Sequence, residues 1–398
     1  MGRFWGGAVI NRIDLIRPDA PDLAARGPWP VGVRTLSLIH PGQLDLLNVT
    51  LAERPLYDRP LVVEMWYPAV AGTRPGGQYK TLLRDGQTPV TLWGRACRDA
   101  VAAAGPFAVV ILSHGYPGNR MLMSHLGEAL AARGYVVASV DHTDSTYADK
   151  AAFASTLVNR PLDTGYVVDV LAGAEWAGLV DTGRLAIVGY SMGGYGALIS
   201  GGAGVSAAAV AAAEGVPFGL LARHAAPVAV DARLKAVVAF GPWGRPRGAW
   251  DAAGMAGLRV PALIVAGSAD EVSGYAEGMR LIFEQSVAVE RWLLTYEGAG
   301  HNAGAPIPAP AESWLVAPGL DPGLDPGLDV VPFEHYADKV WDTVRMNNIA
   351  QHFVAAFLGL HLQGEAGMAR YLAPGWAGFA PGTALGLRLE HRGAGLGA

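Results

Sequence analysis

Cysteine is almost absent from this sequence of 398 residues, which contains only Cys97. A single thiol cannot form a disulfide within the chain, so nothing in the sequence requires an oxidising compartment. A basic block is also missing: 30 basic and 35 acidic residues give a net charge of -5. This balance argues against nucleic acid or an anionic membrane surface as a partner and makes a small-molecule substrate the expectation.

Long apolar runs are also lacking. Arg12 and Asp14 interrupt the N-terminal stretch, which excludes a signal-peptide core there, and the Ala-rich run at 205–213 is too short to cross a bilayer. We therefore expect a cytoplasmic protein without a membrane span, although a chain trimmed of a leader would have the same sequence. The chain also has no H-x-x-x-H or paired-carboxylate spacing for a metal, so we expect no metal and no cofactor.

From residue 107 onward, short apolar strands alternate with helical stretches, the pattern of a parallel sheet covered on both faces. The strands expected in this part occupy residues 107–114, 135–142, 185–188, 235–240, 261–267 and 291–297, and the helices 120–133, 162–179, 192–200 and 341–358. Residues 34–40 and 60–69 are expected to pair at one edge of the sheet, and a helix is expected near 92–104 in the connection 70–105. The fold class is therefore α/β, a mostly parallel, doubly wound sheet.

We divide the chain into an N-terminal extension with an edge strand (1–59), a core (60–361) and a C-terminal tail (362–398). Two insertions interrupt the core. Residues 205–234 are interpreted as a lid, and residues 303–333 contain the repeat PGLDPGLDPGLD at 318–329. We interpret this repeat as a solvated loop and not a calcium site, because the spacing of its aspartates matches no known ligand loop.

The motif Gly189-Tyr190-Ser191-Met192-Gly193 follows a four-residue apolar strand and precedes a small-residue helix. It fits the G-x-S-x-G nucleophile elbow, in which a strained turn exposes a serine hydroxyl above the sheet. Side chains at either glycine would collide with backbone in so tight a turn. Strand, turn and helix together predict Ser191 as a nucleophile for acyl transfer, against the simpler interpretation of a structural Gly-Ser turn.

A serine nucleophile needs a base and an acid that orients the base, and in the α/β-hydrolase fold they follow the serine in the order acid, then histidine. Asp270 comes directly after one expected strand and His301 after the next, at the sheet edge where ligands bind. Glu271 is the alternative acid. His335 is the alternative base, but no strand precedes it, so we favour His301.

The oxyanion hole is expected from two backbone N–H groups, that of Met192 and that of Tyr116 in the loop after residues 107–114. The side chains of Tyr116 and Met192 would flank the attacked carbonyl, and Trp243 would form another wall of the substrate-binding pocket. Such crowding predicts short or compact acyl groups. His114, in the same loop, is interpreted as a buried histidine that bonds loop backbone.

The runs at 112–145, 159–173 and 189–197, with the Asp270 and His301 loops, resemble the platelet-activating factor acetylhydrolase and predicted dienelactone hydrolase group over about residues 60–302. The resemblance implies a calcium-independent serine hydrolase that acts on short or modified acyl esters, with the same triad and oxyanion donors. The chain departs from true dienelactone hydrolases, which use cysteine as nucleophile, so the substrate is not carried over.

The sequence therefore predicts one α/β-hydrolase domain that cleaves carboxylic esters of small molecules through an acyl-enzyme. An amidase, lactonase or thioesterase would use the same triad, and leaving-group preference would separate them. A non-catalytic binding protein on this fold is the alternative from another class.

Overall fold

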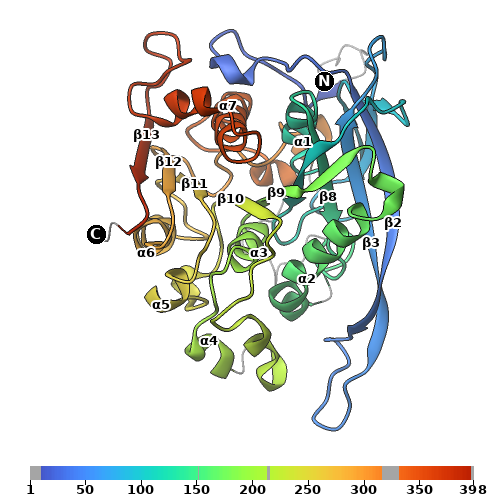
Figure 1. Ribbon diagram of the computed structural model, residues 1–398, viewed down its shortest axis with the longest axis vertical. Coiled ribbons are helices and arrows are strands. Elements are labelled where there is room, and N and C mark those ends of the chain that lie inside the picture. Colours follow the sequence, from blue (N-terminus) through green and yellow to red (C-terminus); the bar gives the residue numbers. More distant parts are fainter. Residues whose placement is uncertain (1–9, 151, 213–215, 316–330, 396–398) are drawn as a thin grey trace, which may run out of the picture.

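The computed structural model describes residues 10–150, 152–212, 216–315 and 331–395. Its centre is a ten-stranded sheet, which Figure 1 shows crossing the molecule from β13 at the left to β2 at the right. The strands, in spatial order, are β13 (Leu387–Arg392), β12 (Arg291–Tyr296), β11 (Ala262–Gly267), β10 (Leu234–Phe240), β9 (Val180–Tyr190), β7 (Phe107–Ser113), β8 (Tyr135–Asp141), β3 (Leu56–Pro68), β2 (Val31–Leu44) and β6 (Cys97–Arg98).

The six strands from β12 to β8 run parallel. Antiparallel pairs join β13 to β12, β3 to β8 and β2 to β3. This arrangement, with helices on both faces, is the α/β-hydrolase fold, and it confirms the predicted fold class. The predicted pairing of 34–40 with 60–69 is also confirmed, as β2 and β3. The strand that leads to Ser191, β9, lies fifth of ten, so Ser191 lies near the middle of the sheet.

The helices divide between the two faces, and in Figure 1 α1 and α7 lie above the row of strands while α2, α3 and α6 lie below it. The helices are α1 (Ser124–Ala131), α2 (Phe153–Leu171), α3 (Met192–Ser200), α4 (Ala207–Ala211), α5 (Ala252–Met255), α6 (Leu281–Gln285) and α7 (Thr343–His361). Side chains alternate along each strand: Ala186 and Val188 of β9 pack with the α1 and α7 side, and Leu185 and Ile187 with the α2 and α3 side. This alternation produces two apolar cores, one on each face.

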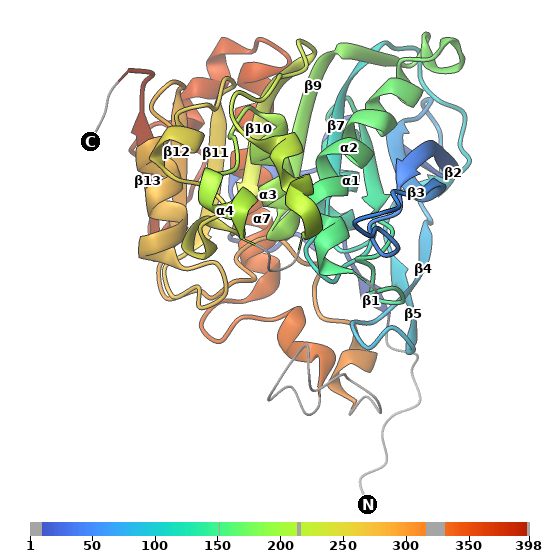
Figure 2. The ribbon, with the colours of Figure 1, turned by 90° about the horizontal axis from the view of Figure 1, so that it is seen from below.

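A second, three-stranded sheet lies beside β3 at the lower right of Figure 2. It consists of β1 (Asn11–Arg12), β5 (Pro89–Trp93) and β4 (Gln78–Leu82). The helix expected near 92–104 is therefore wrong, because β5 ends and β6 lies inside that range. Val90 and Leu92 are buried and their neighbours are more exposed, which is the period of a strand and not of a helix.

Two further differences bear on function. Helix α2 begins at Phe153, nine residues before the expected start, and continues through Pro161. A proline normally marks the first turn of a helix, so the sequence pattern places the start too late. The segment assigned to a C-terminal tail contains β13, which pairs with β12 along its whole length. The PGLD repeat at 318–329 lies outside the described residues.

Within the described residues, no helix combines the length and the apolar character that crossing a membrane requires.

Candidate active site

Ser191 lies in the sharp turn between β9 and α3, with φ 53° and ψ -112°. A positive φ is uncommon for a residue with a side chain, and such strain is typical of a nucleophile elbow. The glycines allow the turn to close, because a Cβ at Gly189 would overlap the carbonyl of Gly193, and a Cβ at Gly193 would overlap that of Ser113. The turn therefore holds Ser191 above the carboxyl ends of the strands.

Three predicted residues, far apart in the sequence, form one hydrogen-bonded chain. His301 Nε2 lies 2.9 Å from Ser191 Oγ, and His301 Nδ1 lies 2.8 Å from Asp270 Oδ2. An ionised carboxylate only accepts hydrogen bonds, so Nδ1–H donates to Asp270 and Nε2 accepts the serine proton. The imidazole is thus held in the tautomer that a general base requires.

Asp270 is well suited to remain ionised. Its Oδ1 accepts hydrogen bonds from the backbone N–H groups of Val272 and Ser273, both at 2.8 Å. Burial alone would raise the pKa of this carboxyl, but the hydrogen bond and charge of His301 and the two backbone donors outweigh it and lower the pKa below 3.8. The alternative acid, Glu271, is exposed and lines the cavity wall.

Gly241, which belongs to no sequence motif described above, lies against this pair. Its φ is +46°, and a Cβ there would lie 3.2 Å from His301 Nδ1 and 3.3 Å from Asp270 Oδ2. A side chain at this position would press between the acid and the base. The glycine follows β10, so its place after a strand was a usable signal.

The predicted oxyanion-hole residues, Tyr116 and Met192, line the same cavity as Ser191. Met192 is the first residue of α3, where backbone N–H groups have no partner within the helix. Tyr116 follows Gly115 in the loop after β7, and a Cβ at Gly115 would come within 3.4 Å of Ser191 Cβ. This close approach brings the loop against Ser191.

A cavity of about 580 Å³ opens over Ser191 and His301. One wall is aromatic: Phe153 makes edge contacts with Tyr116 (ring centroids 5.2 Å apart) and Trp243 (5.3 Å). The other side carries charged groups, among them Glu271, Glu334 and Lys339. None of the described residues of 205–234 lines this cavity, so the described part of the expected lid does not cover it. Residues from 333–339 line the cavity instead.

Phe153 was missed because it belongs to the first turn of α2, which the sequence pattern placed nine residues later. No motif marks it.

His335, the alternative base, also lines the cavity but is bonded elsewhere. Its Nδ1 accepts from Arg84 at 2.6 Å and its Nε2 lies 2.6 Å from Tyr147 Oη. Burial, with the charges of Arg84 and His301, holds the pKa of His335 well below 6.5, so this imidazole is neutral. His114 is buried, with Nδ1 2.6 Å from the carbonyl of Gly115, as expected of a loop-bonding histidine.

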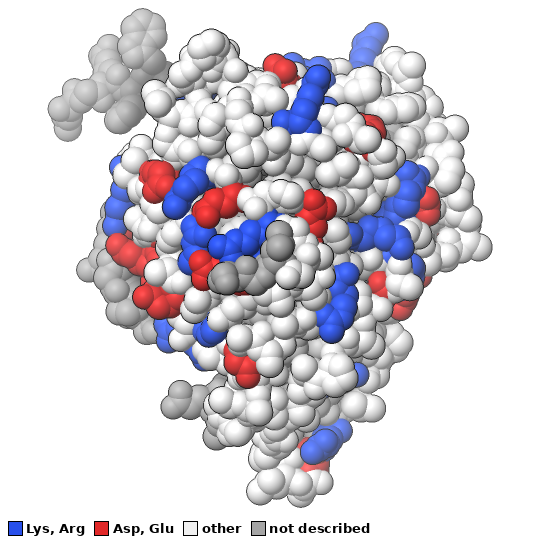
Figure 3. All heavy atoms as spheres, turned by 60° about the vertical axis from the view of Figure 1, so that its left-hand side comes forward, with Lys and Arg blue, Asp and Glu red and all other residues white. Residues whose placement is uncertain are grey.

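Charge elsewhere is mixed. On the face shown in Figure 3, lysine and arginine side chains alternate with aspartate and glutamate. Among the described residues, no three His, Cys, Asp or Glu side chains gather closely enough to hold a metal ion.

Parts of the chain are similar in sequence to proteins named as ester hydrolases. Residues 99–218 match a family model described as PET hydrolase-like; the match includes the Tyr116 loop and Ser191 but ends before Asp270 and His301. Cutinase 2 of Thermobifida cellulosilytica is 26% identical over 198 residues, which cover 50% of this chain and 61% of that protein. Bis(hydroxyethyl) terephthalate hydrolase of Streptomyces coelicolor is 30% identical over 99 residues, covering 24% and 28%.

The chain spans about half the length of the curated relatives it matches. In three dimensions, a ferulic acid esterase from Streptomyces cinnamoneus matches with a TM-score of 0.60 at 20% identity, covering 96% of this chain and 99% of that one. At this identity the likeness shows the fold alone.

Proposed function

We propose that this protein is a serine hydrolase that cleaves carboxylic esters of small molecules through an acyl-enzyme. The observation that carries the proposal is the hydrogen-bonded chain from Ser191 through His301 to Asp270 at the floor of an open cavity. The partial matches to cutinases and to a terephthalate ester hydrolase support the same reaction class. We also propose that the protein is related to the platelet-activating factor acetylhydrolase group, which its core motifs resemble.

In the first half-reaction, Ser191 Oγ attacks the ester carbonyl carbon while His301 Nε2 takes its proton. Asp270 stabilises the imidazolium that forms. The carbonyl oxygen becomes an oxyanion facing the N–H groups of Tyr116 and Met192, and His301 then protonates the departing alcohol. In the second half-reaction, His301 Nε2 takes a proton from a water molecule, whose oxygen attacks the acyl carbon. His301 then returns the proton to Ser191 Oγ as the acyl bond breaks, which releases the acid and restores Ser191.

Labelling with a fluorophosphonate tests the nucleophile without any choice of substrate, because the reagent traps activated serines covalently. We expect one label per chain on the peptide that contains Ser191. A folded protein that takes up no label would overturn the proposal in favour of a binding function.

The aromatic wall favours short or compact acyl groups. Tyr116, Phe153 and Trp243 lie in one contact chain beside Ser191 and limit the length of an acyl group. A methylene that fits an apolar pocket is favourable by about 0.8 kcal/mol, whereas one that meets a wall costs about 1 to 3 kcal/mol in displaced side chains. Single-ring aromatic acids would also fit against such a wall, in keeping with the name of one similar protein, the terephthalate ester hydrolase.

We therefore expect kcat/KM for nitrophenyl esters to peak at short acyl chains and then fall steeply. Trp243→Ala should broaden this profile toward longer chains, because it removes part of the wall. Trp29→Ala is the control, since Trp29 does not line this cavity. A wild-type profile that still rises at an acyl chain of about twelve carbons would contradict the compact pocket.

Turnover should not change when a chelator such as EDTA is added. The proposed steps use only a serine, a histidine, a carboxylate and backbone N–H groups, and the described residues include no cluster suited to a metal. A loss of activity that added metal restores would show that the proposed mechanism is incomplete.

A further inference from the structure

The geometry points to Arg160 as a positioning residue for the oxyanion hole, acting through the carbonyl groups of the loop at 113–116. This inference rests on the proposed function and adds a residue that neither the motif nor the triad includes.

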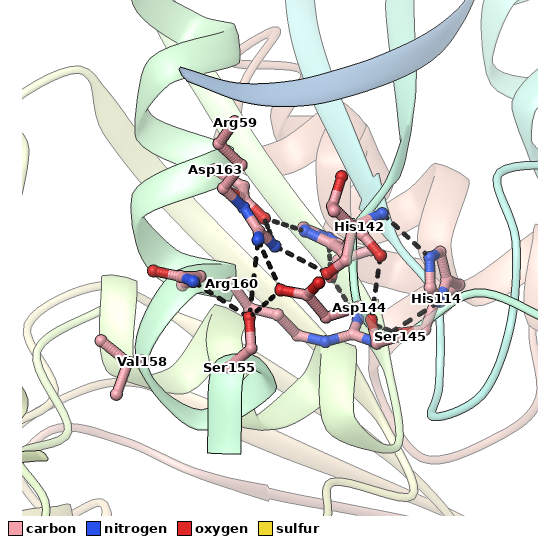
Figure 4. A network of polar contacts seen from close by, with 12 residues as sticks. Arg59, His114, His142, Asp144, Ser145, Ser155, Val158, Arg160 and Asp163 are labelled. Carbon is pink, nitrogen blue, oxygen red and sulfur yellow. Dashed lines mark hydrogen bonds and ion pairs between the residues drawn. The ribbon is translucent and has the colours of Figure 1, made fainter. Parts of the chain in front are cut away.

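Arg160 lies on α2 and is only 1% exposed. Figure 4 shows its guanidinium directed at the loop after β7. It donates hydrogen bonds to the carbonyl oxygen of His114, to that of Gly115 at 2.9 Å and to Ser113 Oγ at 3.2 Å. A fourth bond reaches Ser145 Oγ at 3.0 Å. One buried side chain therefore holds three consecutive residues of the loop that precedes Tyr116.

The bond to Gly115 fixes the direction of the next N–H. In a planar trans peptide, the C=O and N–H groups point in opposite directions. The Gly115 carbonyl accepts from Arg160 and from His114 Nδ1, at 2.9 and 2.6 Å, so the N–H of Tyr116 in the same peptide points away from the guanidinium. That orientation directs it to the cavity that Tyr116 shares with Ser191.

The donor and acceptor in the hydrogen bond between Arg160 and Ser113 are fixed by a chain of buried side chains that starts at Asp163. Asp163 accepts from Arg59 Nε at 2.8 Å and from His142 Nδ1 at 3.0 Å. His142 Nε2 must then accept from Ser113 Oγ, 2.9 Å away, which leaves the serine oxygen to accept from Arg160. Asp163, His142 and Ser113 are each at most 2% exposed. Among the described residues, Arg160 Nε is buried without a hydrogen-bond partner, but both of its terminal nitrogens are bonded. A buried network with this many directed hydrogen bonds is rigid, as an oxyanion hole requires.

The charge of Arg160 adds to this positioning. Within the described residues, its hydrogen bonds all go to neutral groups, so no carboxylate in direct contact cancels it. Burial lowers the pKa of Arg160 to about 9, which still leaves the guanidinium charged at neutral pH. A fixed positive charge behind the carbonyl groups of this loop favours the negative oxygen of the transition state more than the neutral ester.

The test compares Arg160→Met, Arg160→Lys and wild type. We expect Arg160→Met to lower kcat about 10- to 100-fold with KM changed less than about threefold, below the 10²- to 10³-fold loss seen when a donor itself is removed. Affinity for a phenylboronic acid, whose adduct with Ser191 is tetrahedral, should fall by the same factor as kcat. Arg160→Lys keeps the charge but cannot hold both carbonyls, so it should recover part of the loss.

Arg291→Met is the matched control. Arg291 is also fully buried and also donates to backbone carbonyls, those of Phe283 and Val289, but at β12 and not at the site. It should lower the melting temperature and leave kcat and boronate affinity unchanged.

A folded Arg160→Met protein with wild-type kcat and boronate affinity would overturn the inference while the proposed function stood. If Arg160→Met does not fold, wild-type values in Arg160→Lys would do the same. Wild-type protein that neither hydrolyses esters nor takes up fluorophosphonate would overturn the proposed function itself, and the inference with it.

Discussion

Replacing Ser191 with alanine is expected to abolish ester hydrolysis and leave the fold intact. The hydroxyl is the proposed attacking group, and members of a triad act as a unit, so kcat should fall by about 10⁴-fold or more. Alanine has the same Cβ as serine and no additional bulk, so it fits the turn at φ 53°. Initial rates with a nitrophenyl ester and thermal unfolding of both proteins measure the two effects.

Ser206→Ala provides the control for this experiment. Ser206 caps α4, where its side chain accepts from the N–H of Ala209, and it does not line the cavity. Loss of such a cap costs about 1 kcal/mol of stability, without an effect on the reaction. If Ser191→Ala kept even a tenth of wild-type activity, the assignment of the nucleophile would be wrong.

The second large effect concerns the base. His301→Ala should be nearly as damaging as Ser191→Ala, because His301 is the imidazole within reach of the serine oxygen. Asp270→Asn should lower kcat by about 10⁴-fold and change KM less, since an amide favours the wrong imidazole tautomer. His335→Ala should lower stability through the lost bonds to Arg84 and Tyr147, but lower kcat less than tenfold.

Steady-state kinetics of the three variants, with circular dichroism to confirm folding, separate these outcomes. An inactive but folded His335→Ala protein, beside an active His301→Ala protein, would reverse the assignment of the base.

The central fold could be predicted because its signals are local. Each strand of the parallel sheet is a short apolar run bounded by turn residues, and the elbow at Ser191 combines a strand, a fixed motif and a helix in about fifteen residues. Asp270 and His301 could be named because each directly follows such a strand. The hydrogen bonds that join them depend on strand order, which no single stretch of sequence contains.

What could not be predicted depends on contacts distant in sequence. Arg160 and Phe153 lie on one helix, but nothing local shows that one supports the oxyanion loop while the other lines the cavity. The start of that helix was placed too late because Pro161 lies inside it, whereas a proline is more often found in the first turn. The strand β13 was missed because Leu387–Arg392 alternates apolar with charged residues weakly and has no following element to frame it.

Removing β13 should affect how a shortened version of the protein behaves in solution. A chain ending after α7 would retain Ser191, Asp270 and His301 but expose the backbone of β12 along Arg291–Tyr296, a run in which every residue is buried. Unpaired strand edges of this kind attract the same edge of another copy. A boundary drawn at residue 361, sensible from the sequence, should therefore yield protein that precipitates when concentrated, whereas one drawn beyond Arg392 should remain dispersed.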